Sequence, residues 1–236
     1  MELTKELNGK IERCKKLFGI DIPVSVRRAA MGGDVEYFPD EGRAVLVLGE
    51  GPEGSLADSF ARIRLGLDGH PLLATMRFQP GYTPPEATLI QHFTTITKPV
   101  MIAWIFLTMK RHLGADEFAL EVGDMKKLLR LMERRLDQAG ESVSGVDRMY
   151  TLLPVRVVLY AVGESGDDAF AMPERIHDAE KATMLHYIDV IKKYIAIEPG
   201  AEALIHMANE LGIRYSVSVV NAPRPYFDVR ESDYVQ

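Results

Sequence analysis

The sequence predicts an α+β fold that is mainly helical, with a small antiparallel sheet near its N-terminus. Two observations lead to this prediction. Clustered short runs of alternating or continuous apolar residues, which are typical of strands, occur only near the N-terminus. Apolar residues at helical spacing then continue through most of the chain, so the strands do not alternate with helices as they would in a parallel βαβ fold.

The N-terminal elements are predicted to be one helix followed by three strands. Apolar residues spaced four apart from Leu3 to Ile11 indicate the helix. Apolar and polar residues alternate over residues 22–26, which is the period of a half-buried strand. Two further strands are predicted in the runs VEYFP and RAVLVLG, with turn chemistry between them at residues 39–42. We expect these three strands to form the antiparallel sheet.

The remaining elements are predicted to be helices separated mostly by Gly, Pro or Asp, with one late strand at residues 214–220. Residues 1–220 are expected to form a single globular α+β domain. Residues 221–236 contain two prolines and several charges, which favours an extended or disordered tail. The predicted helices span residues 54–67, 86–97, 99–113, 115–138, 145–162, 173–196 and 200–212.

Composition and charge narrow the class of protein. The 236 residues carry a formal net charge of −6, so the chain has no general attraction to nucleic acid or to anionic lipid. The single cysteine, Cys14, excludes an internal disulfide, and Lys15 and Lys16 nearby would lower its pKa. No secretory signal is recognised, and the most apolar run, residues 99–109, is about half as long as a membrane span. We expect a cytoplasmic protein that binds neither nucleic acid nor a membrane.

The helix predicted at residues 54–67 has two faces of different character. Its apolar residues follow the spacing i, i+4, i+7 and i+11 from Leu56, which predicts a stripe that faces the core. Asp58 and Arg62 lie roughly 200° and 240° around the helix from Leu56. These two residues therefore share the opposite face, with Ser59 beside them.

The order of elements around this helix resembles a known family. A sheet, a helix with Ser55 as its N-cap, the run R-L-G-L-D-G-H-P and a second helix containing L-I-Q-H-F resemble the N-terminal half of zincin-type metallopeptidases over roughly residues 20–110. In that family the first helix carries His-Glu-x-x-His and the second helix supplies a third zinc ligand, usually Glu. The resemblance implies a zincin-like scaffold in which the ligands have been replaced.

Each of the replaced positions lacks the chemistry of the family. Asp58 and Arg62 stand at the two histidine positions. Ser59 stands at the position of the general-base Glu, and Gln91 stands at the third ligand. Arg62 cannot lose its proton to bind zinc, Gln91 is a poor zinc ligand, and Ser59 cannot act as a carboxylate base.

The resemblance therefore implies a binding or regulatory protein without catalytic residues, bound metal or another cofactor. Its ligand, a small molecule, a peptide or another protein, would occupy a vestigial cleft. The residues implied for this cleft are Asp58, Ser59, Arg62, Gln91 and His92.

Two interpretations of the polar face remain open. Asp58 and Arg62, four residues apart, suit an ordinary exposed ion pair worth roughly 0.3–0.5 kcal/mol. Alternatively, Arg62 replaces the metal as a fixed cation, with Asp58 and Gln91 as its neighbours, and the cleft accepts an anionic or peptide-like ligand.

Two functions of other classes also remain open. One is a purely structural helical subunit. The other is a metal-dependent hydrolase with a non-standard ligand set, which would need ligands from several helices. Its candidate ligands are acidic residues together with His70, His92, His177, His186 and His206.

Two charged helix faces are predicted to be exposed to solvent. In the helix at 115–138, basic residues between Lys126 and Arg135 alternate with acidic residues, which favours local ion pairs over binding of nucleic acid. In the helix at 200–212, Glu202, His206 and Glu210 form an acidic face. The residues predicted to face the core from the helix at 115–138 are Leu128, Leu129, Met132 and Leu136.

Overall fold

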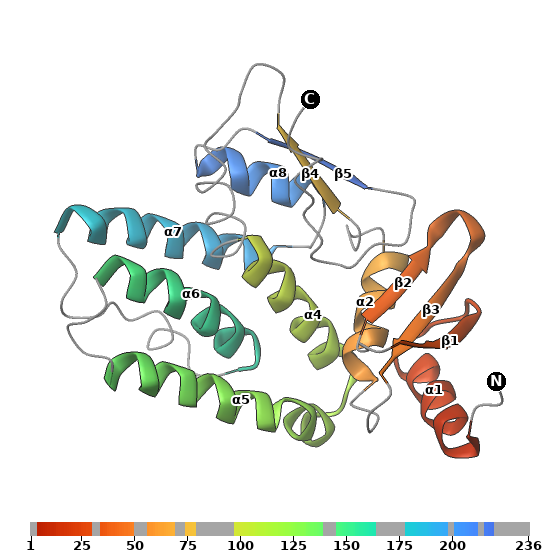
Figure 1. Cartoon of the computed structure of the whole chain (residues 1–236). Coiled ribbons are helices and arrows are strands. Elements are labelled where there is room, and N and C mark those ends of the chain that lie inside the picture. The colour runs from red at the N-terminus through yellow and green to blue at the C-terminus, as the bar shows by residue number, and fades with distance from the viewer. Residues whose placement is uncertain are drawn as a thin grey trace.

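The structure of the chain is a computed structural model, and it is mainly helical (Figure 1). The described residues form a three-stranded mixed sheet, a second sheet of two strands, and a group of helices. The predicted helix at residues 86–97, apart from Thr97, and the predicted tail at residues 221–236 lie outside the described residues. The structure describes residues 4–29, 34–49, 56–68, 74–78, 97–138, 145–163, 178–197, 201–211 and 215–219.

The first helix, α1 (Lys5–Leu17), forms where the apolar spacing predicts it. The hydroxyl of Thr4 accepts a hydrogen bond of 3.2 Å from the backbone N–H of Leu7, which caps the N-terminus of the helix. Leu7 and Ile11 are buried, so the predicted apolar face does pack against the protein.

The N-terminal sheet is mixed, and the prediction of a purely antiparallel sheet is wrong. Strands β1 (Val24–Arg28), β2 (Asp34–Phe38) and β3 (Arg43–Leu48) lie in the order β1-β3-β2. β2 pairs with β3 in the antiparallel direction, whereas β1 pairs with β3 in the parallel direction. Every residue of β3 after Arg43 is buried, while β1 has several exposed residues. Because a continuous apolar strand is most stable when it is paired on both edges, β3 occupies the centre.

Helix α2 (Ala57–Leu67) contacts β2, α1 and α4 (Lys98–His112) and is buried on most of its circumference. Leu56, rather than the predicted Ser55, occupies the N-cap position and makes no side-chain cap. The predicted apolar stripe is buried except for Leu67, which is only partly buried. The other residues buried on α2 are Ala57, Ser59, Ala61 and Leu65.

The remaining helices form a second part of the protein on the other side of α4 from the mixed sheet (Figure 1). α4 contacts α6 and α7, and α5 contacts α6. α8 contacts β5, which pairs with β4 in an antiparallel two-stranded sheet; β4 was not predicted. The bounds are α5 (Ala115–Gln138), α6 (Gly145–Ala161), α7 (Asp178–Ala196), α8 (Ala201–Glu210), β4 (Ala74–Phe78) and β5 (Tyr215–Val219).

One cluster of buried apolar side chains extends from α1 to α8. Trp104 of α4 is its largest fully buried side chain, and its indole N–H donates a hydrogen bond of 3.2 Å to the backbone carbonyl of Tyr194 on α7. Phe18, which follows α1, lies with its ring centre 6.4 Å from that of Phe60 on α2. Among the residues that the structure describes, no helix is long and apolar enough to cross a membrane.

Among the described side chains of helix α5, the set that faces the core shares only Leu129 with the predicted set. Phe118 and Val122 are buried, and Met125 and Leu129 pack against the core. Leu128 and Met132 are 57% and 40% exposed, so the prediction that they face the core is wrong. The helix carries two leucine-containing stripes, and periodicity alone does not show which of them packs inward.

Candidate functional site

Two of the residues predicted for the vestigial cleft lie together on one arc of α2. The Nε of Arg62 donates a hydrogen bond of 2.9 Å to Oδ2 of Asp58, four residues earlier. The Arg62 side chain is 16% exposed and that of Asp58 is 34% exposed. The predicted ion pair is therefore present, but it is half-buried rather than an exposed surface pair.

The other three predicted cleft residues are placed differently. Ser59 follows Asp58 on the helix and is buried, with 5% of its surface exposed. Gln91 and His92 lie outside the described residues. The convergence of Arg62 and Gln91 therefore stays a prediction.

The chemistry of the Asp58–Arg62 pair suits recognition of an anion. A guanidinium group carries five N–H donors in one plane, and a bidentate carboxylate or phosphate matches that plane. The hydrogen bond from Nε to Asp58 fixes the orientation of the plane. Arg62 is thus oriented before any ligand arrives, which reduces the entropy lost on binding.

The histidines proposed as alternative metal ligands are only partly described. His186 has its Nε2 3.2 Å from the backbone carbonyl oxygen of Glu210, and His206 is exposed. His70, His92 and His177 lie outside the described residues. Within the described ranges, no group of three His, Cys, Asp or Glu side chains is arranged to hold a metal ion.

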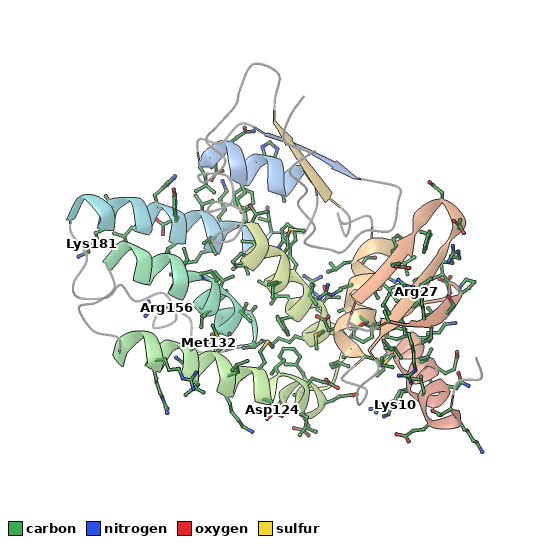
Figure 2. The ribbon with its side chains drawn as sticks, in the orientation of Figure 1. Lys10, Arg27, Asp124, Met132, Arg156 and Lys181 are labelled. Carbon is green, nitrogen blue, oxygen red and sulfur yellow. The ribbon has the colours of Figure 1, made fainter. Side chains whose placement is uncertain are left out.

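A cavity of about 260 Å³ lies between α1, the start of α2 and the junction of α4 with α5. Arg13 of α1 and Glu117 of α5 form an ion pair of 2.9 Å at this cavity. Figure 2 labels Lys10, one of the charged lining residues, on α1. The lining residues are Lys10, Arg13, Cys14, Leu56, Ala57, Leu113, Glu117 and Glu121.

The thiol of Cys14 in this cavity is not activated. Burial raises the pKa of Cys14 to about 11, and the charge of Arg13 opposes this shift only in part. The prediction that neighbouring lysines lower this pKa is wrong, because removal of the thiolate from water outweighs the nearby positive charge. The thiol is protonated near neutral pH and is a poor nucleophile there.

A polar cluster between α7 and α8 was missed by the sequence reasoning. The hydroxyl of Tyr194 donates a hydrogen bond of 3.0 Å to Oε1 of Glu210, and Lys193 forms an ion pair with the same oxygen. The hydrogen bond from Lys193 lowers the pKa of Glu210. Glu210, predicted only as part of a solvated face, therefore links two helices. No spacing rule relates residue 210 to residues 193 and 194, so the sequence carried no signal for this contact.

Comparisons of the chain with protein-family models, with curated proteins and with solved structures found no match. The resemblance to zincin-type metallopeptidases therefore rests on the residues of this chain alone.

Proposed function

We propose that the protein is a non-catalytic binding protein on a zincin-like scaffold, and that its vestigial cleft accepts a peptide-like or small-molecule ligand with a carboxylate group. The observation that carries this proposal is the half-buried guanidinium of Arg62, which is held 2.9 Å from Asp58. The two residues stand where the resemblance implies the two zinc-binding histidines. A fixed cation at that position would attract the same kind of oxygen atom that zinc attracts in the peptidases.

The non-catalytic part of the proposal follows from the same residues. An arginine keeps its proton at every ordinary pH and cannot bind zinc. The Asp58 carboxylate already accepts a hydrogen bond from Arg62. Ser59 is buried, and a serine hydroxyl is not a carboxylate base. Ligand binding without hydrolysis is the function that these three side chains support best.

The ligand is tested with two probes that differ only in their charge. One is a short N-acetylated peptide with a free C-terminal carboxylate, and the other is the same peptide as its C-terminal amide. Binding is followed by NMR of the arginine Nε–Hε groups, and the signal of Arg62 is assigned with the Arg62→Lys variant. We expect the free acid to move the Arg62 signal saturably and the amide to leave it unmoved, because only the acid offers a bidentate carboxylate.

Arg64 provides the matched control, since it lies on the same helix and pairs with Asp68 four residues later. Its Nε–Hε signal should not move, and Arg64→Lys should bind the probe as the parent protein does. If about 10 mM of the free acid leaves the Arg62 signal in place, the binding free energy is smaller in magnitude than roughly 3 kcal/mol. The proposed ligand class is then wrong.

The absence of catalysis is tested separately on protein purified without added metal. We expect no stoichiometric zinc and no cleavage of casein or short peptides. If the protein contains about one zinc per chain, and chelation removes both the zinc and a hydrolytic activity, the binding-protein proposal is wrong. The protein is then a metal-dependent hydrolase.

A further inference from the structure

The outer face of α5 carries exposed apolar residues. Leu120, Leu128 and Leu131 are 83%, 57% and 45% exposed. At about 100° per residue, these three leucines lie within an arc of roughly 80°, on the other side of the helix from Phe118 and Val122. We call this arc, which also contains Glu117, Asp124 and Arg135, the outer face of α5. At the N-terminal end of the arc, Glu117 pairs with Arg13 of α1. Figure 1 shows α5 at the lower edge of the molecule, with α6 above it.

The charges of α5 are separated along its length. Residues 115–124 contain four acidic residues and no basic residue, which gives −4. Residues 125–138 contain five basic and two acidic residues, so their net charge is 5 − 2 = +3. This order of charges interacts favourably with the helix dipole, which is positive at the N-terminus and negative at the C-terminus. The dipole does not explain why three leucines are exposed on the same face. In Figure 2, Asp124 is labelled on the lower side of α5, away from α6.

We propose that the outer face of α5 is a dimer interface, in which two copies of this chain pair their α5 helices in antiparallel orientation about a two-fold axis. An antiparallel pair places the acidic half of each helix opposite the basic half of the other. A parallel pair would place like charges together. A two-fold axis between residues 125 and 126 brings Leu120 opposite the partner's Leu131. It also brings Asp124, which forms an exposed ion pair of 2.9 Å with Lys127 of its own chain, opposite the partner's Lys127. The surface is thus complementary to itself, as a two-fold interface must be.

The size of this interface indicates a reversible dimer. A helix of 24 residues is about 36 Å long, and a pair of such helices lies at the low end of specific interfaces. We expect a dissociation constant in the range of about 1 to 100 μM. The exposed ion pairs should make the dimer weaker as the salt concentration rises.

Sedimentation equilibrium of the full chain between about 1 and 200 μM tests this pairing. We expect Leu131→Glu to raise the dissociation constant at least about tenfold, because it places a charge in the apolar contact. Leu185→Glu is the control, since Leu185 on α7 is 43% exposed and Leu131 is 45% exposed. It should leave the dissociation constant unchanged. Circular dichroism verifies that both variants are folded.

A charge exchange tests the orientation. The double variant Asp116→Lys with Asp124→Lys reverses two charges of the N-terminal half and brings its net charge from −4 to 0. Lys127→Glu with Arg135→Glu reverses the two charges that face those positions and brings the C-terminal half from +3 to −1. Each double variant alone should be monomeric, whereas an equimolar mixture should form heterodimers, because opposite charges then face each other again. A wild-type chain that stays monomeric at about 200 μM in low salt would overturn the proposal. The outer face of α5 would then bind a partner other than a second copy of this chain. Double variants that fail to associate when mixed would also overturn it.

Discussion

Tyr194→Phe should change how the stability of the protein depends on alkaline pH. Burial, the hydrogen bond to Glu210 and the charge of Glu210 together raise the pKa of Tyr194 to about 12, and burial is the largest of the three causes. The folded-state pKa lies above the ordinary value of 10, so the neutral tyrosine stabilises the folded state. That contribution is complete below about pH 10 and is lost as the pH rises through about 12.

The magnitude follows from the shift and from the exposure of the two groups. At about pH 11 the phenol is ionised in unfolded chains and neutral in folded ones, so a shift of this size removes about 1.4 kcal/mol of stability. Tyr194 is 3% exposed, but the side chain of its partner Glu210 is 37% exposed and is screened by water. We therefore expect this contribution of Tyr194 to the free energy of unfolding to fall by about 1 kcal/mol at about pH 11.

The measurement is urea unfolding of the parent and of Tyr194→Phe at about pH 8 and about pH 11, followed by the fluorescence of Trp104, the only tryptophan of the chain. At pH 8 the variant should be less stable by about 1–2 kcal/mol, because it loses a hydrogen bond to a charged acceptor. At pH 11 this difference should shrink by about 1 kcal/mol. Glu210→Gln removes the charge but keeps an acceptor, so it should show a smaller change with pH. An equal difference between parent and Tyr194→Phe at both pH values would refute the reasoning.

Three further predictions concern the core, the thiol and the ion pair. Phe60→Ala should lower the free energy of unfolding by about 3–5 kcal/mol in denaturant titration, because Phe60 is fully buried, whereas Leu185→Ala at an exposed site should cost under about 1 kcal/mol. Cys14 should react slowly with a thiol reagent at about pH 8 in the folded protein and rapidly in urea; equal rates would contradict its raised pKa of about 11. Asp58→Asn should lower the free energy of unfolding by about 1 kcal/mol, which is more than Asp68→Asn should lower it, because Arg62 is less exposed than Arg64, the partner of Asp68. Thermal unfolding of the two variants should give the same ranking.

The elements that the sequence determined are those set by contacts within a few residues. The helix predicted at 115–138 has the bounds of α5, because helix periodicity and helix-ending residues act locally. The Asp58–Arg62 ion pair was predicted for the same reason, since a spacing of four residues places two side chains on one face of a helix. The resemblance to zincins and the role of Gln91 and His92 stay predictions from sequence.

The tertiary structure decided which surfaces are covered and which distant residues meet. The strand β1 joins β3 in the parallel direction, which depends on how the chain passes around the sheet and not on the pattern of β1. Burial of Cys14 reversed the expected direction of its pKa shift, because helices distant in sequence remove the thiol from water and bring Glu117 and Glu121 near it. Packing against the core likewise determines which of the two apolar stripes of α5 is buried. The stripe that does not pack inward leaves Leu120, Leu128 and Leu131 exposed. Local spacing describes each element by itself, whereas burial and charge environment are properties of the packed whole.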